Sequence, residues 1–324
     1  MRVGIIGYGR MGSEFARSIR ERGFEIGTIV RTSGVYTLDG EKVSELDDWL
    51  VHFRKIDIAA LCIPTLDDGR TAFEYIAALV KKGIPVVTCE KGALGNYFSE
   101  LKDWLDKIGF RASVGGKTGM ASWLRENMTP TVREIHAVLN ATMNFTFDGV
   151  GGGRILEQVI EEAKTLGYTE PKTVTPLEVI NKETTGDIPM KTAILFNTGI
   201  GGRFGPFIKA KDIFPKLISE EDLRRLVREA ASRRFVVSIT KEDQEENVIG
   251  GFKQRFGNWI ISAGFKLKEE NPVFRWLNPK GVDNALVLYE GKYGKIGLIG
   301  EGAGSSPTVS SMIRDTANLL RFSG

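Results

Sequence analysis

A glycine-rich stretch near the start of the chain has the spacing of a phosphate-binding loop. Residues 7–12 read Gly7-Tyr8-Gly9-Arg10-Met11-Gly12 and follow the short apolar run 3–6. Glycines at this spacing allow a tight turn, a close approach of a pyrophosphate to the backbone, and close packing of the next helix on the preceding strand. The context of strand, loop and helix therefore predicts a dinucleotide-binding loop, with a glycine-rich turn of another α/β domain as the alternative.

Two lysines and one aspartate are the charged candidates for chemistry. Asp187 and Lys191 are four residues apart in a helix-like segment, which places a carboxylate and an ammonium on one helix face. Lys91 follows the apolar run 84–89, so we expect it just past the carboxyl end of a strand, where ligands bind in open α/β sheets. By residue type alone, the first two are also compatible with an exposed ion pair, and Lys91 with a surface lysine in a turn.

Arg31-Thr32-Ser33 directly follow the second predicted strand, residues 24–30, at the place where a dinucleotide fold contacts the adenosine ribose. An acidic residue at this place would accept bonds from a ribose 2′-hydroxyl, whereas an arginine with two hydroxyls suits a 2′-phosphate. This favours NADP over NAD; the alternative is a solvated loop cation.

Two other glycine-containing stretches need separate interpretation. Residues 300–308 read GEGAGSSPT and precede a predicted final helix; by composition alone they are compatible with an ordinary loop. Residues 115–118 read GGKT, but a Walker A loop needs its opening glycine at position 111, which is Arg111. An NTPase loop is therefore not predicted.

The elements that must position these residues follow an α/β pattern in the first part of the chain. Apolar runs at residues 3–6, 24–30, 56–63 and 84–89 alternate with helix-like segments. Pro64 ends the third run, and Asp67 or Asp68 is expected to be the N-cap of the next helix. Residues 97–108 are expected to form another helix. The pattern predicts a Rossmann-type, doubly wound nucleotide-binding domain.

From Thr131 onward the pattern changes to β-rich segments, such as residues 135–140 and 235–240, separated by helices. This predicts a second domain of the α+β class. Residues 149–153 are interpreted as a glycine-rich hinge or loop, residues 155–166 as a helix, and Ser219 with Asp222 as a capping box.

Composition indicates an ordinary globular chain. The 324 residues carry 44 basic and 41 acidic side chains, a balance that does not suggest a nucleic-acid or membrane surface. The two cysteines, Cys62 and Cys89, fall in the region predicted as interior strands, so a disulfide framework is not expected. We therefore expect a cytoplasmic location. His52 and His136 lack ligand spacing, and no transition-metal site is predicted.

Taken together, these stretches resemble the homoserine dehydrogenase family, which reduces aspartate semialdehyde to homoserine with NAD(P)H. The resemblance runs nearly end to end. In chain order, its motifs are GYGRMG at 7–12, VVTCEK at 86–91, ASVGG at 112–116, LNATMNF at 139–145, GYTE at 167–170, GDIPMK at 186–191, DNA at 283–285 and GEGAGSSPT at 300–308. Longer relatives append a regulatory domain, so we expect a short form without feedback control through such a domain.

The resemblance implies that Lys191 and Lys91 approach the reacting carbonyl or hydroxyl, and that the late glycine loop closes on the cofactor. Hydride addition to an aldehyde builds negative charge on oxygen, so a cation that also donates a proton lowers the barrier. We therefore expect Lys191 to donate and accept the proton, and Lys91 to polarise the oxygen or assist the transfer. The implied partners are a small amino-acid substrate and a second copy of the chain, as a homodimer through the second domain.

The predicted site has a cofactor part and a substrate part. The predicted cofactor-binding residues are Gly7, Tyr8, Gly9, Arg10, Met11, Gly12, Arg31, Thr32, Ser33, Pro64, Thr65, Lys91, Gly302, Gly304 and Thr308. The predicted substrate-binding residues are Gly115, Thr142, Tyr168, Glu170, Asp187 and Lys191. NADP (NADPH) is the preferred cofactor, with NAD as the second choice.

Several positions depart from the family pattern. Arg111 stands where the family usually has a glutamate that helps hold a monovalent cation, so no such ion is predicted. Gly119 replaces a usual proline, and Pro171-Lys172 replace an Asp-Pro pair. Lys182 stands where an acidic residue is expected, although Glu183 takes that place if the chain shifts by one residue.

The resulting hypothesis divides the chain into a dinucleotide-binding domain, residues 1–128 and 300–324, and a substrate-binding, catalytic and dimerisation domain, residues 129–299. The predicted function is that of an NADP-dependent homoserine dehydrogenase. The alternatives are a related NAD(P)-dependent dehydrogenase of another small oxo or amino acid, and a non-catalytic dinucleotide-binding homologue.

Overall fold

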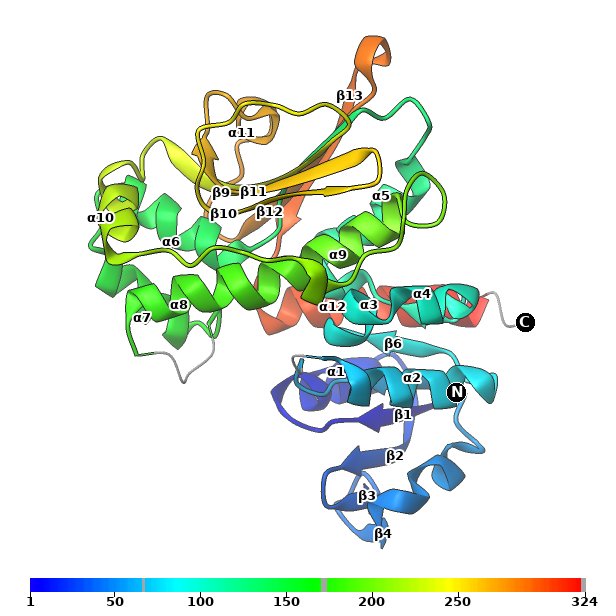
Figure 1. The fold of residues 1–324 in the computed structure, drawn as a ribbon. Coiled ribbons are helices and arrows are strands. Elements are labelled where there is room, and N and C mark those ends of the chain that lie inside the picture. Colours follow the sequence, from blue (N-terminus) through cyan, green and yellow to red (C-terminus); the bar gives the residue numbers. More distant parts are fainter. Residues whose placement is uncertain (66–67, 170–173, 322–324) are drawn as a thin grey trace. The chain divides into compact units, whose positions relative to one another are not determined.

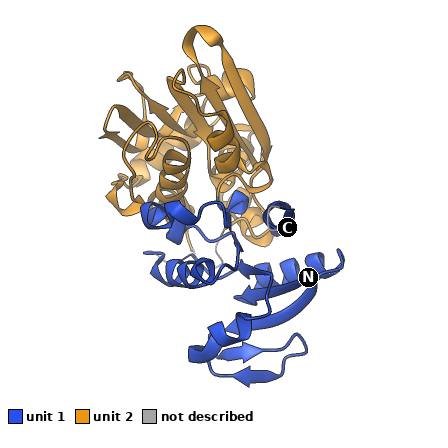
Figure 2. Cartoon of the chain, turned by 90° about the vertical axis from the view of Figure 1, so that its right-hand side faces the viewer, with its two compact units in different colours: residues 1–113, 305–324 blue, residues 114–304 orange. Residues whose placement is uncertain are grey.

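The computed structural model describes residues 1–65, 68–169 and 174–321. The chain forms two compact units, unit 1 from residues 1–113 and 305–324 and unit 2 from residues 114–304 (Figure 2). These divisions differ from the predicted boundaries at 128/129 and 299/300. Within unit 2, the 3₁₀ helix η4 (Gly116–Thr118) packs on β13 (Lys295–Glu301), and α5 (Met120–Asn127) packs on α9 (Ile188–Gly199). Those contacts draw residues 114–127 and 300–304 into the second unit.

Unit 1 is built on a seven-stranded sheet with the order β4-β3-β2-β1-β5-β6-β7. Its strands are β1 (Arg2–Ile6), β2 (Glu25–Arg31), β3 (Gly34–Tyr36), β4 (Lys42–Ser44), β5 (Ile58–Leu61), β6 (Val86–Thr88) and β7 (Ile108–Gly109). The five adjacent strands β2, β1, β5, β6 and β7 are parallel to one another. At one edge of the sheet, β3 pairs antiparallel with β2, and β4 pairs antiparallel with β3. The strand order reverses beside β1, so the doubly wound arrangement predicted from the apolar runs is present.

Helices cover this sheet as the apolar stripes require. They are α1 (Arg10–Arg20), α2 (Arg70–Lys81), α3 (Gly92–Asn96), α4 (Phe98–Leu101) and α12 (Ser305–Arg321), with the 3₁₀ helices η1 (Leu46–Phe53), η2 (Lys102–Trp104) and η3 (Arg111–Ser113). On α1, the apolar stripe of Phe15, Ala16 and Ile19 is buried in the hydrophobic core of the unit. The last helix, α12, packs against α1 and beside β7, so it completes this unit although it comes from the far end of the chain.

Two predictions within unit 1 are wrong. The cap position of α2 is Gly69, with a left-handed backbone (φ 68°), while the Asp68 carboxylate accepts from the Arg70 N–H at 3.0 Å; Asp67 lies outside the described residues. Residues 97–108 do not form one helix but α4, η2 and then β7. Ile108 is buried as a strand residue opposite Val86, so sheet pairing overrides the helical periodicity.

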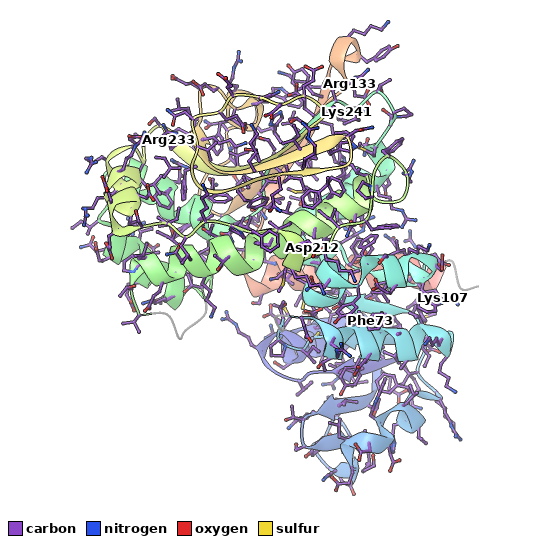
Figure 3. All side chains as sticks on the ribbon, viewed as in Figure 1. Phe73, Lys107, Arg133, Asp212, Arg233 and Lys241 are labelled. Carbon is purple, nitrogen blue, oxygen red and sulfur yellow. The ribbon has the colours of Figure 1, made fainter. Side chains whose placement is uncertain are left out.

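Unit 2 is built on a six-stranded antiparallel sheet with the order β10-β11-β9-β8-β12-β13. The strands not yet given are β8 (Glu134–Val138), β9 (Arg233–Thr240), β10 (Ile249–Phe256), β11 (Trp259–Leu267) and β12 (Asp283–Tyr289). Arg133 and Lys241 lie beside each other next to this sheet (Figure 3), where the Lys241 N–H donates to the Arg133 carbonyl at 3.2 Å. The α+β class predicted for this part of the chain is present.

Helices α6 (Ala141–Gly151), α8 (Pro176–Lys182) and α9 run along one face of this sheet (Figure 1). The unit also contains α7 (Leu156–Thr165), α10 (Glu220–Arg228), α11 (Pro272–Trp276), the π-helical turn η5 (Glu183–Asp187) and the 3₁₀ helices η6 (Ala210–Asp212) and η7 (Gly291–Tyr293). The capping box of Ser219 and Asp222 begins α10 as predicted. The interpretation of residues 149–153 as a hinge is wrong for Gly149 and Gly151, because α6 continues through them. A Cβ on Gly151 would lie 2.6 Å from the Ala230 carbonyl oxygen, so glycine permits this close packing.

A chain of buried polar side chains crosses β8, β9 and β11. His136 bonds through Nδ1 to Ser238 Oγ (2.9 Å) and through Nε2 to the Glu134 carboxylate (2.8 Å). Lys266 Nζ donates to Ser238 Oγ (2.8 Å) and to both carboxylate oxygens of Glu246 (2.7 and 2.8 Å). Burial lowers the pKa of Lys266 to about 8, against the opposing effect of Glu246. His136 is therefore a hydrogen-bonded core residue.

Among the described residues, no helix has the length and apolar character needed to cross a bilayer.

Candidate active site

The glycine loop of residues 7–12 lies between β1 and α1, as predicted. Gly7 has φ 89°, and a Cβ on it would lie 2.6 Å from the Cys62 carbonyl oxygen. A Cβ on Gly12 would lie 2.0 Å from the Gly7 oxygen, so α1 approaches the loop this closely only because residue 12 is glycine. At Gly9 no described atom lies within 4 Å of the Cβ position. The backbone thus leaves room for a ligand beside the amino end of α1, and this cradle fits a pyrophosphate.

The neighbouring predicted cofactor residues form the walls of this loop. Arg10 is exposed at the first position of α1, and its carbonyl accepts from Ser13 Oγ at 3.1 Å. Met11 packs against the core of unit 1. Pro64 follows the end of β5, two residues after Cys62, whose backbone N–H donates to the Ile6 carbonyl at 2.7 Å. The ends of β1 and β5 are thereby tied together under the loop.

Arg31 ends β2 and lies between two tyrosine rings. Its Cζ is 5.2 Å from the centroid of the Tyr8 ring and 5.0 Å from that of Tyr36, both within cation–π range. Ser33 Oγ is 2.8 Å from the Tyr36 hydroxyl, which helps to orient that ring. Arg31, Thr32 and Ser33 are all exposed. The guanidinium is therefore oriented and open to solvent at the carboxyl end of β2.

The carboxyl ends of β5 and β6 place Thr65 and Lys91 together. The Lys91 N–H donates to Thr65 Oγ1 at 3.4 Å, and Lys91 is half-buried at the cap of α3. The neighbouring Glu90 carboxylate accepts the first two N–H groups of α3, at 2.5 and 2.9 Å. Burial raises the pKa of Glu90 despite these bonds. Lys91 therefore lies just past a strand end, as predicted.

Arg111 is held by the last helix of unit 1. Asp315 Oδ2 accepts from the Arg111 backbone N–H at 2.8 Å, and Asp315 Oδ1 lies 3.1 Å from Arg111 Nε. The side chains are only 18% and 7% exposed, respectively. Burial raises the pKa of Asp315 to about 6, although Arg111 acts in the opposite direction. The arginine that departs from the family pattern thus has a structural partner in this chain.

In unit 2, a π-helical turn brings two carboxylates to one asparagine. Asn140 Nδ2 donates to Glu183 Oε2 at 2.5 Å and to Asp187 Oδ2 at 2.9 Å. Asn140 Oδ1 accepts from the Met143 N–H at 2.7 Å and so caps α6. The turn at residues 183–187 is wider than an α-helical turn, with bonds from i to i+5. Glu183 is therefore positioned beside Asp187, at the place that the one-residue shift anticipated.

Lys191 lies one turn further along the same helix. Its Nζ is 2.7 Å from Asp187 Oδ2 and donates to the Leu139 carbonyl at 3.0 Å. The Lys191 and Asp187 side chains are 13% and 16% exposed, so this is not the ordinary surface ion pair left open by the sequence. A lysine ammonium has three donors. Two of the three have partners within the described part of the chain, which leaves one for a ligand.

The other predicted substrate residues lie around the beginning of α6. Thr142 Oγ1 donates to the Tyr168 carbonyl at 2.7 Å, and the Tyr168 ring meets Phe145 edge-on with centroids 5.4 Å apart. These contacts join the segment after α7 to α6. Glu170 lies outside the described residues, as do Pro171 and Lys172.

The glycines of the two later loops meet in unit 2. Gly115 (φ 83°) precedes η4, and its carbonyl accepts from Thr118 Oγ1 at 2.8 Å. Gly302 donates to the Val282 carbonyl at 2.8 Å, and Gly304 has φ 104°. A Cβ on Gly116 would lie 2.8 Å from the Gly302 Cα. Thr308 belongs instead to α12 of unit 1, so the predicted cofactor residues are divided between the two units.

Sequence reasoning assigned no role in this cluster to Asn140 or Asn284, whereas Glu183 was considered as a replacement for Lys182. Asn284 Nδ2 donates to the Leu139 carbonyl at 3.3 Å, the same oxygen that accepts from Lys191. Asn140 and Asn284 fall inside the motifs at 139–145 and 283–285, which was the available signal. Their partners are distant in sequence, so their roles depend on the fold.

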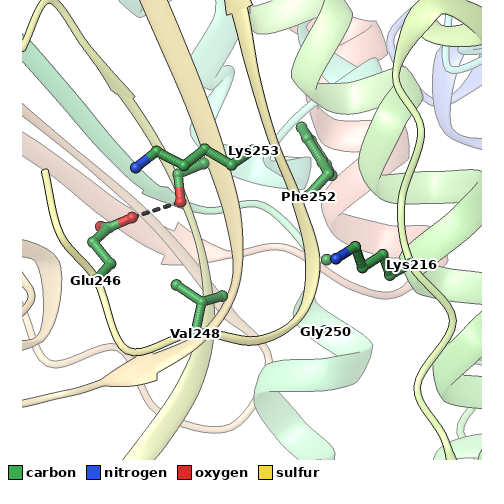
Figure 4. Close-up of a pocket in the computed structure, with 8 residues that line it drawn as sticks. Lys216, Glu246, Val248, Gly250, Phe252 and Lys253 are labelled. Atoms are coloured by element: carbon green, nitrogen blue, oxygen red, sulfur yellow. Dashed lines mark hydrogen bonds between the residues drawn. The ribbon is translucent and has the colours of Figure 1, made fainter. Parts of the chain in front are cut away.

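The pocket drawn in Figure 4 lies elsewhere in unit 2 and holds about 190 Å³. It is lined by Lys216, Glu246, Val248, Gly250, Gly251, Phe252, Lys253 and Ser262. The Ser262 hydroxyl donates to Glu246 at 2.5 Å, and Glu246 is also paired with Lys266. This pocket contains none of the predicted site residues.

A glycine cradle on a doubly wound sheet, with a lysine held by a carboxylate in a second α+β unit, defines an NAD(P)-linked oxidoreductase. Comparison with family models agrees with this class: an oxidoreductase family with an NAD-binding Rossmann fold matches residues 1–94, and homoserine dehydrogenase matches residues 122–317. The second match covers more than half of the chain. The chain belongs to the homoserine dehydrogenase family and is an oxidoreductase acting on a CH–OH group, which confirms the resemblance in its motifs.

Relatives with this function match nearly the whole chain. The homoserine dehydrogenase of Pyrococcus horikoshii is 26% identical over 97% of this chain and 95% of that protein. That of Corynebacterium glutamicum is 23% identical over 98% of this chain and 72% of that longer protein.

Solved structures of related proteins have the same fold. A hyperthermophilic archaeal homoserine dehydrogenase in complex with NADPH superposes with a TM-score of 0.70 at 24% identity, covering 99% of this chain and 98% of that one. The homoserine dehydrogenase of Thermoplasma acidophilum superposes with a TM-score of 0.72 at 17% identity, covering 99% of both chains. The fold of this chain is thus common to these structures.

Proposed function

We propose that this protein is an NADP-dependent homoserine dehydrogenase that catalyses reversible hydride transfer between NADPH and L-aspartate 4-semialdehyde to give L-homoserine. The observation that carries the proposal is the half-enclosed Lys191 ammonium, held at 2.7 Å by Asp187 and at 3.0 Å by the Leu139 carbonyl. Two fixed contacts orient this ammonium, and its third donor is available to a substrate oxygen. The bound nicotinamide supplies or accepts the hydride.

The protein's own groups then have separate tasks. Lys191 Nζ donates a proton to the carbonyl oxygen during reduction and recovers it from the hydroxyl during oxidation. Asp187 keeps the ammonium in place, and Glu183, which shares the Asn140 amide with it, offers a carboxylate oxygen to the amino group of the substrate. Thr142 and Tyr168 form the neighbouring wall. Lys91 polarises the reacting oxygen or assists the transfer.

Lys191→Met tests the role of the lysine. Loss of a general acid is expected to lower the turnover of homoserine with NADP⁺ by about 10²- to 10⁴-fold while leaving NADPH affinity unchanged. Lys211→Met, an exposed lysine in η6 of the same unit, is the matched control. Near-full turnover by the Lys191 variant would contradict the assignment. If the wild type oxidises other small hydroxy acids but not homoserine, the substrate is another oxo or amino acid.

The NADP preference rests on Arg31, whose guanidinium is oriented by Tyr8 and Tyr36 and exposed. Its bonds to a 2′-phosphate are charge-assisted and contribute about 1.5–3 kcal/mol. Arg31→Asp is therefore expected to lower the NADPH-to-NADH affinity ratio by about 10- to 100-fold. Arg22→Asp, at the end of α1, makes the same charge change elsewhere in unit 1. An unchanged ratio in the Arg31 variant would show that Arg31 is a solvated loop cation.

The remaining expectations stay proposals. A homodimer formed through the second domain is tested by sedimentation of the purified chain, and a monomer at micromolar concentration would contradict it. The absence of a monovalent cation requirement, expected from Arg111, is tested by assays in sodium, potassium and tetramethylammonium buffers of equal ionic strength. A cytoplasmic location is tested by cell fractionation.

A further inference from the structure

Asn284 is a buried asparagine that shares an acceptor with Lys191. It lies at the start of β12 and has 0% of its surface exposed. Its Nδ2 donates to the Leu139 carbonyl at 3.3 Å, and Lys191 Nζ donates to the same oxygen at 3.0 Å. The position of the Leu139 carbonyl therefore affects both the asparagine amide and the lysine ammonium.

The opposite side of the Asn284 amide is packed against the late glycine loop. A Cβ on Gly302 would lie 2.3 Å from both Cγ and Nδ2 of Asn284, so only glycine permits this approach. The loop is fixed there by the bond from the Gly302 N–H to the Val282 carbonyl at 2.8 Å. The loop backbone and the Leu139 carbonyl thus confine the amide from two directions.

Stability alone does not explain an asparagine at this position. Its Oδ1 is buried and has no hydrogen-bond partner within residues 1–65, 68–169 and 174–321. Leaving a buried acceptor without a donor costs about 1–3 kcal/mol. Such a group in a folded protein calls for an explanation, and the Asn284 amide shares its acceptor, the Leu139 carbonyl, with the proposed proton donor.

We propose that Asn284 is a positioning residue for Lys191. Its N–H group holds the Leu139 carbonyl in the orientation that the ammonium needs, and the packing of Gly302 prevents the amide from rotating away. Asp187 restrains the ammonium from the helix side, and Leu139, held by Asn284, restrains it from the strand side. The inference rests on the proposed role of Lys191 as the proton donor and acceptor.

Asn284→Asp tests this inference because it preserves the shape of the side chain and replaces the N–H donor with an acceptor. The expected result is a fall in kcat for homoserine oxidation of about 10- to 100-fold, since one restraint on a general acid–base group is removed. The KM for NADP⁺ is expected to stay within about twofold, because no cofactor contact is changed. Gly302→Ala, which pushes a methyl group into the amide, is a second variant expected to lower kcat.

Asn144→Ala is the matched control. Asn144 is also a buried asparagine, and its Oδ1 likewise has no hydrogen-bond partner among the described residues. Its amide donates to the carbonyls of Gly281 and Asp283, just before and at the start of the same strand, instead of to the Leu139 carbonyl. We expect it to lower the melting temperature with little change in kcat. Equal kcat losses in the Asn144 and Asn284 variants, or an unchanged kcat in Asn284→Asp, would overturn the inference. A wild type without homoserine oxidation would instead overturn the proposed function.

Discussion

The buried pair of Arg111 and Asp315 makes the stability of unit 1 depend on pH in a way that can be measured. The Asp315 side chain is 7% exposed, and burial raises its pKa from 3.8 to about 6. Because the folded pKa is higher than the unfolded one, folding favours the protonated acid. The stabilisation from this group is therefore fully present below about pH 3.8 and is lost as pH rises through about 6.

The size of the effect follows from the shift. About two pKa units at 1.36 kcal/mol each correspond to about 3 kcal/mol between the two limits. Asp315→Asn imitates the protonated acid, because its amide oxygen can still accept from the Arg111 N–H. The free energy of unfolding of this variant, relative to wild type, is therefore expected to rise by about 3 kcal/mol between pH 4 and pH 7.5.

The assay is urea unfolding followed by circular dichroism at several pH values between 4 and 7.5. Other titrating groups cancel in the difference between variant and wild type. Asp106→Asn, an exposed position in the same unit, is the control and is expected to give a flat difference. If Asp315→Asn instead becomes less stable relative to wild type as pH rises, the attraction of Arg111 outweighs burial and the reasoning is refuted.

Three further predictions concern the glycine loop, the substrate pocket and the polar chain of unit 2. Gly12→Ala is expected to lower both the melting temperature and the affinity for NADPH, because its methyl group would lie 2.0 Å from the Gly7 oxygen. Gly9→Ala is expected to weaken NADPH binding without changing the melting temperature. Calorimetry measures the melting temperatures and fluorescence titration the affinities, and equal melting temperatures for the two variants would contradict the packing argument. Glu183→Gln is expected to raise the KM for homoserine about tenfold or more without changing NADPH affinity, and an unchanged KM in steady-state assays would remove the carboxylate from substrate binding. Because burial lowers the pKa of Lys266 from 10.5 to about 8, stabilisation from this residue is present above pH 10.5 and lost as pH falls through 8. The unfolding free energy of wild type relative to Lys266→Met should thus rise by about 3 kcal/mol from pH 7.5 to 10.5, and a constant difference in urea unfolding would count against it.

The cofactor half of the site was predictable because its determinants are local. The loop of residues 7–12 follows its strand directly and opens its helix, so glycine spacing and apolar pattern together specify the turn. Lys91 and Arg31 lie at the ends of strands as predicted for the same reason: Arg31 ends β2 and Lys91 follows β6, so the local apolar runs were enough to locate both. The order of motifs along the chain was enough to identify the family.

Helix assignments failed where periodicity competes with tertiary contacts. The apolar spacing of residues 97–108 suits a helix, but pairing with β6 buries Ile108 more effectively in a strand. The glycine at 151 suggested a loop, yet it lies within α6, where it packs closely against residues 230 and 231. Neither neighbour can be identified from the local sequence.

By itself, the sequence determined the class of each unit, the nucleotide loop and the pairing of Asp187 with Lys191, because these depend on residues within a few positions of one another. Only the tertiary structure decided that Glu183 rather than Lys182 lies with Asp187 beside Asn140. A π-helical turn changes which side chains lie on the same helix face, and the spacing of apolar residues in the sequence does not indicate such a turn. The tertiary structure also decided that Arg111 pairs with Asp315, 204 residues away, and that Asn284 meets the carbonyl used by Lys191. Contacts between residues so distant in sequence exist only once the sheets have formed.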